Sequence, residues 1–263
     1  MHSLIYGLLS VTTKSLDFGY TGAWVYGHLT LAVIAIPLTI LAFRLRWPVA
    51  VRVLLLVVAV WSGISAAIVQ FVFGMNAPMT LPAEAFLKSD APVKVLDMGC
   101  GSGRATVMVL TARPQASVTA LDNWSADYID HNSEARLLAN AEAIGASGRT
   151  TVATGDMRAV PFPDASFDGV VSTYAIDHLD RAGTAKALSE AARVLKPGGE
   201  FLLAVMNGDH WTMFTYGPHF HGGGHAGDGI GRWTSKVKDA GLEVSEVGTR
   251  PWTVYVLSRK PRH

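Results

Sequence analysis

Residues 95–103 read VLDMGCGSG, a compact apolar run that ends in a glycine-rich turn. Short apolar runs of this kind are typical of buried parallel strands. Glycine lets the backbone turn tightly and approach a ligand closely, and a helix that follows such a turn offers free N–H groups at its start. The stretch therefore predicts a strand, a ligand-binding turn and a helix that begins near Arg104.

Segments typical of strands and helices alternate from this turn almost to the end of the chain. The strands are expected at residues 93–98, 117–122, 150–154, 167–173, 200–207, 242–250 and 252–260, and the helices from residue 104 and over 125–145, 182–195 and 229–241. Alternation of this kind predicts an α/β fold with helices between parallel strands. The last two strands are joined without room for a helix, so they must be antiparallel. We predict a Rossmann-like, mostly parallel seven-stranded sheet with an antiparallel last strand, preceded by two transmembrane helices.

The composition of the chain is unusually apolar and nearly neutral. Of 263 residues, 49% are hydrophobic and 16% are charged, and the formal net charge is +1. Soluble domains carry about a quarter of charged residues. A neutral chain has no general attraction to nucleic acid, so we expect no nucleic-acid partner. The single cysteine, Cys100, excludes a disulfide framework and any multi-cysteine metal site.

The apolar excess is concentrated before residue 75. Residues 24–43 and 53–73 contain no Asp, Glu, Lys or Arg, and each run is long enough to cross a hydrocarbon layer of about 30 Å. A cleaved signal peptide and a pair of buried helices of a soluble core are the alternatives. We predict a multi-pass membrane protein with the lipid bilayer as a partner. Its parts are an N-terminal tail at 1–23, a membrane hairpin at 24–75, a linker at 76–92 and an α/β domain at 93–263.

A second carboxylate indicates what the glycine turn binds. Asp122 ends the second predicted strand, close to the offset of about 20 residues at which a carboxylate binds ribose. A dinucleotide fingerprint needs its third glycine one position later than Gly103. The pair of motifs therefore predicts a nucleoside site and disfavours a dinucleotide.

Several motifs, in this order along the chain, resemble those of the class I S-adenosylmethionine-dependent methyltransferases, in the branch that acts on small molecules, lipids and quinones. The resemblance spans residues 93–259 and is carried by VLDMGCGSG, ALDNW at 120–124, GDMRAVPFPDASFDGVVST at 155–173 and ARVLKPGGEFLL at 192–203. It implies a methyltransferase with S-adenosyl-L-methionine as its cofactor. The reaction it implies is an in-line displacement of the sulfonium methyl group by a nucleophile, which depends mainly on alignment and exclusion of water.

The resemblance also implies roles for individual residues. Asp97 would help to hold the methionine end of the cofactor, Asp122 would bind the ribose hydroxyls, Asp156 would meet the adenine amine and Met157 would pack on the ring. The other expected cofactor-binding positions lie in the glycine turn and at strand ends: Gly99, Cys100, Gly101, Gly103, Asn123 and Thr173. Taken singly, any of the acids fits a helix cap or a partner of an arginine equally well. Cys100 is interpreted as a small turn residue and not as a nucleophile.

Candidate catalytic bases lie in two places. Tyr174, Asp177 and His178 follow the fourth predicted strand, and His219 and His221 lie in a loop rich in glycine and histidine. Three imidazoles of that loop suit a metal by spacing, but no carboxylate or cysteine completes a familiar site, and we predict no metal. A polar lid and a histidine base remain open as alternatives for this loop.

Aromatic residues in the same loop and the preceding hairpin favour a lipophilic acceptor, such as a lipid or a quinone-like molecule. A small soluble or volatile thiol or amine is the alternative acceptor. A membrane-tethered domain that binds the cofactor without turnover is the alternative from another class. The sequence does not predict the oligomeric state.

The orientation of the hairpin poses a conflict. Arg44, Arg46 and Arg52 lie in the expected loop between the two spans, and the positive-inside rule places such a loop in the cytoplasm. Two full spans would then leave the α/β domain outside. The cofactor is made in the cytosol, so we expect a cytoplasmic domain, with a hairpin that is atypical in orientation or does not cross fully.

Protease added to sealed, right-side-out cells tests this orientation. A cytoplasmic domain stays intact until the cells are opened, because the membrane excludes the protease. Digestion of the domain in sealed cells would place it outside and would restore the positive-inside orientation.

Overall fold

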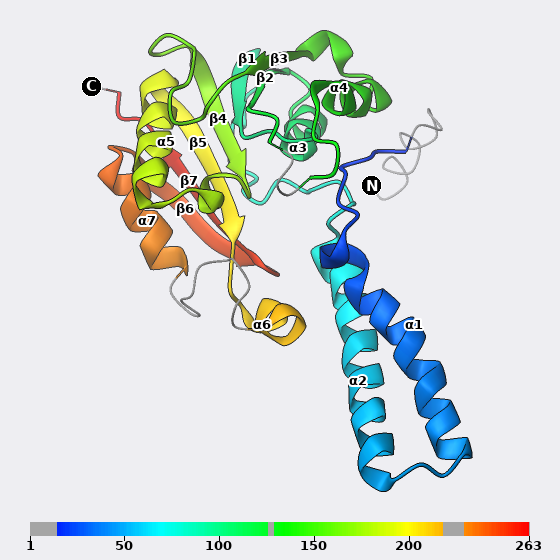
Figure 1. The fold of residues 1–263 in the computed structure, drawn as a ribbon. Helices are drawn as coiled ribbons and strands as arrows, with labels where there is room; N and C mark the ends of the chain where they lie inside the picture. The colour runs from blue at the N-terminus through cyan, green and yellow to red at the C-terminus, as the bar shows by residue number, and fades with distance from the viewer. Residues whose placement is uncertain (1–14, 126–128, 218–228, 263) are drawn as a thin grey trace.

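The computed structural model describes residues 15–125, 129–217 and 229–262. An α/β domain carries two long helices that project from it as a hairpin (Figure 1). The carboxyl ends of the central strands β4 and β5 point toward the side from which the hairpin projects. The hairpin and the carboxyl ends of the sheet therefore share one side of the molecule.

The domain is built on a seven-stranded sheet in the order β3-β2-β1-β4-β5-β7-β6. β7 runs antiparallel to both neighbours, and all the other pairs are parallel. This confirms the predicted fold class. The strands are β1 (Val93–Met98), β2 (Ala116–Asp122), β3 (Thr150–Thr154), β4 (Phe167–Thr173), β5 (Leu195–Met206), β6 (Glu243–Arg250) and β7 (Thr253–Arg259).

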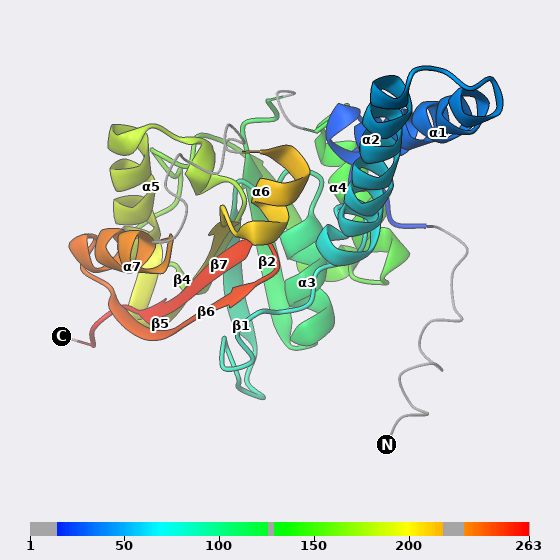
Figure 2. The same cartoon turned by 90° about the horizontal axis from the view of Figure 1, so that it is seen from below.

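Helices cover both faces of the sheet (Figure 2). On one face, α5 and α7 pack through Leu188 and Trp233, and on the other, α3 and α4 pack through Val109 and Leu137. The helices are α1 (Ala23–Arg44), α2 (Val49–Ala67), α3 (Arg104–Ala112), α4 (Glu134–Ala143), α5 (Arg181–Val194), α6 (His210–Tyr216) and α7 (Gly229–Asp239), with the π-helical turn η1 (Ile68–Phe73) and the 3-10 turns η2 (Ser147–Arg149) and η3 (Ile176–His178).

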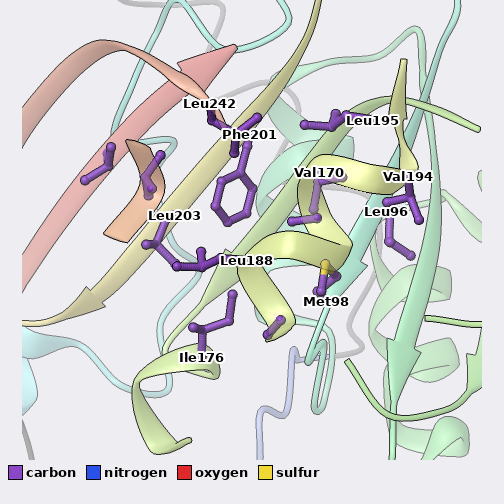
Figure 3. Packing of buried hydrophobic residues seen from close by; sticks show 14 of the residues in the cluster. Leu96, Met98, Val170, Ile176, Leu188, Val194, Leu195, Phe201, Leu203 and Leu242 are labelled. Carbon is purple, nitrogen blue, oxygen red and sulfur yellow. The ribbon is translucent and has the colours of Figure 1, made fainter. Parts of the chain in front are cut away.

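The larger hydrophobic core lies between the sheet and α5 (Figure 3). Phe201 and Leu203 of β5 belong to the same buried cluster as Leu188 of α5 and Ile176 of η3. Burial of large apolar side chains is the dominant stabilising term in such a layer. The packing fixes the connection between β4 and α5, which carries the candidate bases.

The helix predicted over residues 125–145 is shorter than expected. α4 begins at Glu134, after the N-cap residue Ser133. Trp124 and His131 have φ values of 59° and 53°, a left-handed conformation that does not continue an α-helix. The Asp130 N–H donates to the carbonyl of Gly19 at 3.1 Å. Contacts with a segment distant in sequence therefore replace the helical hydrogen bonds that the pattern predicts.

Residues 210–216 form the short helix α6, where the sequence analysis places only a loop. The side chain of Asp209 caps this helix by accepting a hydrogen bond from the Thr212 N–H at 3.0 Å. Its other oxygen accepts from the Trp252 N–H at 2.7 Å. One carboxylate therefore starts α6 and ties it to the turn between β6 and β7.

The hairpin has its large side chains on the outside. Small residues such as Ala32, Ala35 and Ser62 are buried within it, whereas Val33 is 64% exposed and Leu54 is 63% exposed. α1 and the continuous helix Val49–Phe73 are both long and apolar enough to cross a membrane. Helices of a soluble core bury their large apolar side chains, and small residues at the contact are typical of helices packed in lipid.

The segment predicted as a linker, residues 76–92, packs on the α/β domain. Phe86 is fully buried and Leu87 nearly so, in a cluster with Val95 and Met108. The Leu87 N–H also donates to the Glu200 carboxylate at 2.7 Å. The hairpin is thus joined to the domain by a segment that is part of the domain core.

Candidate functional site

A cavity of about 380 Å³ lies at the carboxyl ends of the parallel strands. Ligands of open α/β sheets bind at this edge. Its wall combines residues from three regions far apart in sequence. The ends of the strands and the loops after them supply Gly99, Gly101, Asp122, Asn123, Ile129, Asn132, Met157, Tyr174, His178 and Met206. The domain end of the hairpin and the residues beside it supply Tyr20, Trp24 and Met75, and the β6–β7 turn supplies Trp252.

The glycine turn after β1 leaves no room for side chains. Gly99, Gly101 and Gly103 have φ values of 75°, 51° and 86°, which favour glycine. A Cβ on Gly99 would lie 2.5 Å from the Ala175 Cβ, and one on Gly101 would lie 2.5 Å from Ile129. Gly99 and Gly101 therefore keep the backbone open to the cavity, while Gly103 allows α3 to pack close to α4.

Asp122 organises the turn from the end of β2. Its Oδ2 accepts a hydrogen bond from the Gly101 N–H at 2.8 Å, and its Oδ1 accepts from the Trp124 N–H at 2.7 Å. Asn132 donates to Oδ1 as well, at 3.2 Å. The carboxylate borders the cavity, and Asn123 beside it lines the cavity too. Since a carboxylate has about four acceptor positions, Asp122 can still accept bonds from a ligand.

Asp97 lies beneath the turn and is fully buried. Its Oδ2 accepts a hydrogen bond from the Thr106 hydroxyl at 2.6 Å, while its Oδ1 has no partner within the described part of the chain. Burial raises the pKa of Asp97 from 3.8 to about 7, an effect that the Thr106 bond opposes and the charge of Asp122 adds to. The site thus holds an acid that a nearby cation would ionise.

A smaller cavity of about 60 Å³ adjoins the first one. Asp156 and Met157 line it, and it shares Met157, Gly99 and Asp122 with the larger cavity. The carboxylate of Asp156 forms an ion pair with Arg158 at 2.6 Å, which lowers the pKa of Asp156. Asp156 therefore borders a cavity next to the glycine turn while its carboxylate is engaged with a neighbouring guanidinium.

Tyr174 forms a wall of the larger cavity. Its ring stacks on Trp252 with ring centroids 4.7 Å apart, and its hydroxyl is hydrogen-bonded to the Thr253 hydroxyl. Burial raises the pKa of Tyr174 to about 12. A phenol in this state is a poor proton acceptor at neutral pH, so its geometry suits an aromatic platform better than a base.

Asp177 and His178 lie in the turn η3, which follows β4. Oδ2 of Asp177 accepts a hydrogen bond from the Met206 N–H at 2.9 Å, and its buried Oδ1 has no partner among the described residues. Burial raises the pKa of Asp177, whereas the charge of His178 opposes the rise. His178 itself lines the cavity, so of the two it is the one placed to reach a ligand.

The remaining predicted residues lie away from the cavity or outside the described residues. Cys100 is buried against Ala120 and Leu137, and burial raises the pKa of its thiol, which agrees with a packing role. Thr173 ends β4 but lines neither cavity. His219 and His221 lie outside the described residues. Within the ranges that the structure describes, no group of three His, Cys, Asp or Glu side chains is placed to hold a metal ion.

Residues 17–21, here called the strap, cross the glycine turn before α1 begins. Phe18 is fully buried, and its carbonyl accepts a hydrogen bond from the Ser102 hydroxyl at 2.7 Å. Asn140 of α4 bonds to both the N–H and the carbonyl of Asp17. These contacts bring Tyr20 into the cavity wall, where burial raises its pKa. Tyr20 lies in the predicted N-terminal tail, and its place in the cavity was not predicted because no local pattern reveals contacts across more than 80 residues.

Arg104 joins the other end of the hairpin to the same turn. It is the first residue of α3 and only 7% exposed. Its guanidinium donates to the carbonyl of Gly74, which ends the hairpin, at 2.6 Å and to that of Ala77 at 2.9 Å. Carbonyls at a helix C-terminus carry partial negative charge, so a cation is favourable there. Separate hydrogen bonds therefore join the two ends of the hairpin to the glycine turn and the start of α3.

The sheet order, the glycine turn and the carboxylates at the ends of β1 and β2 are typical of a Rossmann-like nucleotide-binding domain. Residues 95–199 match a family model described as a methyltransferase domain. The chain carries a class I S-adenosylmethionine-dependent methyltransferase domain.

Curated relatives and solved structures agree with this family. A ubiquinone/menaquinone biosynthesis C-methyltransferase, UbiE, of Methylobacterium nodulans is 35% identical over 114 residues, which are 42% of this chain and 41% of the relative. An O-methyltransferase, resE, of Aspergillus sclerotiorum is 32% identical over 126 residues, 48% of this chain and 44% of the relative. The chain therefore spans less than half the length of these relatives. A SAM-dependent methyltransferase from Methanosarcina mazei shares the fold with a TM-score of 0.53 and 17% identity, over 70% of this chain and all of that one.

Replacement of Arg104 by Met should weaken cofactor binding by about tenfold or more, because two charge-assisted hydrogen bonds next to the glycine turn are lost. Calorimetric titration of the full chain in detergent with S-adenosylhomocysteine measures this effect.

Arg113→Met is the matched control. Arg113 also donates to backbone carbonyls, at Phe86 and Glu84, but it lies at the opposite end of α3. We expect both variants to lower the melting temperature and only Arg104→Met to weaken binding. Equal affinities for the two variants would show that Arg104 serves stability alone.

Proposed function

We propose that the protein is a membrane-anchored S-adenosylmethionine-dependent methyltransferase that transfers a methyl group to a lipophilic, quinone-like or lipid acceptor. The observation that carries this proposal is the composite wall of the larger cavity. Gly99 of the glycine turn and Asp122 at the end of β2 border the same space as Tyr20 and Trp24 at the domain end of the hairpin. A cofactor and an acceptor that reaches the base of the hairpin would therefore meet there.

The groups that line the cavities, together with Asp97, which is buried beneath the glycine turn, fit the cofactor. The unpartnered Oδ1 of Asp97 suits the ammonium group at the methionine end, and Asp122 suits the ribose hydroxyls. Met157 and Asp156 border the adjoining small cavity, which suits the adenine ring. The bound cofactor would supply an electrophilic methyl group, and the chain would align the acceptor and exclude water.

The acceptor side of the cavity favours an apolar molecule. Tyr20, Trp24, Tyr174 and Trp252 supply aromatic surface, and Met75 and Met206 supply flexible thioethers. No lysine or arginine is among the described residues that line this cavity. The similarity to a ubiquinone/menaquinone C-methyltransferase points to the same class of acceptor. We assign His178 as the group that accepts a proton where the acceptor must lose one.

The hairpin supports the membrane location. Large aliphatic side chains face outward along both helices, whose length fits a span. We place the α/β domain in the cytoplasm, where the cofactor is made.

Transfer of labelled methyl groups from S-adenosylmethionine tests the function. The solubilised protein is incubated with host membranes or soluble extract, and the label is partitioned into organic, aqueous and headspace fractions. We expect label in the organic fraction only when membranes are present, and much less with His178→Gln, which should still bind S-adenosylhomocysteine. Label confined to the aqueous or headspace fraction would instead identify a small soluble or volatile acceptor.

Cofactor binding should also release a proton from Asp97. At about pH 6 the free protein holds this carboxyl largely protonated, because its pKa is raised to about 7, and a cofactor ammonium would ionise it. Binding should therefore strengthen as pH rises through about 7, and its dependence on the protonation of Asp97 should vanish above about pH 8, where the free protein already holds the carboxylate ionised.

Calorimetry in buffers of different ionisation enthalpy measures this proton directly. The observed binding enthalpy should depend on the buffer for the unmodified chain and lose that component in Asp97→Asn. A buffer-independent enthalpy for the unmodified chain at about pH 6 would contradict the assignment.

A further inference from the structure

The helix α6 exposes apolar side chains beside the hairpin. Trp211, Met213 and Phe214 are 37%, 37% and 44% exposed. α6 lies on the side of the domain from which the hairpin projects, and both views place it next to α2 (Figures 1 and 2). An exposed apolar cluster of this kind marks a contact with another molecule or with a membrane.

Two hydrogen bonds and one ring contact hold α6 against the hairpin. Trp61 of α2 donates from its indole N–H to the carbonyl of Phe214 at 2.9 Å, and the Tyr216 hydroxyl donates to the carbonyl of Trp24 at 2.7 Å. His28 of α1 packs edge-on against Trp61 with ring centroids 5.0 Å apart and lies 5.6 Å from the Tyr216 ring. Phe214 therefore lies at the level of Trp61, and Tyr216 lies at the level of Trp24 and His28.

The part of the hairpin between its tip and the level of His28 and Trp61 is too short to cross a membrane. From His28 to Arg44, α1 extends about 24 Å, and from Trp61 to Val49, α2 extends about 18 Å, at 1.5 Å per residue. The hydrocarbon layer is about 30 Å thick. A hairpin that crosses it must therefore be immersed beyond the level of α6, toward the domain.

The charges at the hairpin tip exclude a shallower position. Arg44, Arg46 and Arg52 lie at or near the loop between the helices. A hairpin that stopped within the membrane would leave these side chains in hydrocarbon, which costs several kcal/mol for each charge. Full insertion carries them to the far surface and draws the domain end of the hairpin into the near interface.

We propose that α6 lies in the membrane interface, with Trp211, Met213 and Phe214 inserted into the lipid. This inference rests on the membrane anchoring proposed above and adds a second membrane contact. Because Tyr216 bonds to Trp24, which lines the larger cavity, the inserted helix lies next to that cavity. The acceptor then passes into the cavity from the headgroup region of the same leaflet and does not leave the membrane.

Spin labels attached to single cysteines test the depth of α6. The described chain has one cysteine, buried Cys100, so Cys100→Ser provides a background without a reactive thiol. Single labels at Phe214→Cys, Val57→Cys and Val247→Cys are compared in liposomes of the full chain by their accessibility to oxygen and to a water-soluble nickel complex. Val57 of α2 is an exposed hairpin position, and Val247 of β6 is an exposed position on the sheet edge.

We expect the label at position 57 to be reached by oxygen and shielded from nickel, and the label at 247 to be open to nickel. At position 214, the accessibility of the label to oxygen and to nickel should lie between these limits, as expected for a shallow position in the membrane. A label at 214 as open to nickel as that at 247, while 57 stays shielded, would overturn the inference and leave the hairpin anchored. Nickel access at 57 as well would overturn the membrane anchoring itself.

Discussion

Close approach of the backbone to a ligand after β1 is the constraint on which the rest of the site depends. At Gly99 and Gly101 a side chain would overlap Ala175 and Ile129, so the turn is held from both sides by residues of distant loops. Asp122 then fixes the position of the turn through the Gly101 N–H. Beneath the turn, one carboxylate oxygen of Asp97 has no partner among the described residues, so it can accept a hydrogen bond from a cationic group.

The hairpin and the α/β domain form one structural unit. The strap reaches the glycine turn through Phe18 and Ser102, while Arg104 reaches the opposite end of the hairpin at Gly74. These are hydrogen bonds in a nearly dry environment, where an unpaired partner is costly. A change in the position of the hairpin would therefore disturb the glycine turn. In the membrane-anchored protein that we propose, the hairpin would therefore hold the cavity at a fixed distance from the membrane, which a flexible tether would not do.

Much of the fold could be predicted because its signals are local. Apolar runs mark the strands, and the glycines with Asp97 and Asp122 mark a nucleoside site within one β-α-β unit. The length of α4 and the presence of α6 could not be predicted in this way. Asp130 bonds to the strap and Asp209 bonds to the Trp252 N–H, and both partners are remote in sequence. The contributions of Tyr20 and Trp252 to the cavity were missed for the same reason.

The sequence by itself determined the α/β class, the order of the motifs, the two apolar helices and the class of cofactor, because each depends on residue type and spacing within short segments. Only the tertiary structure decided which side chains line the cavity, since its wall combines positions from 20 to 252. It also separated His178, which lines the cavity, from Tyr174, whose hydroxyl is engaged with Thr253. Hydrogen bonds and packing between distant segments decide such matters, and a linear pattern does not record them.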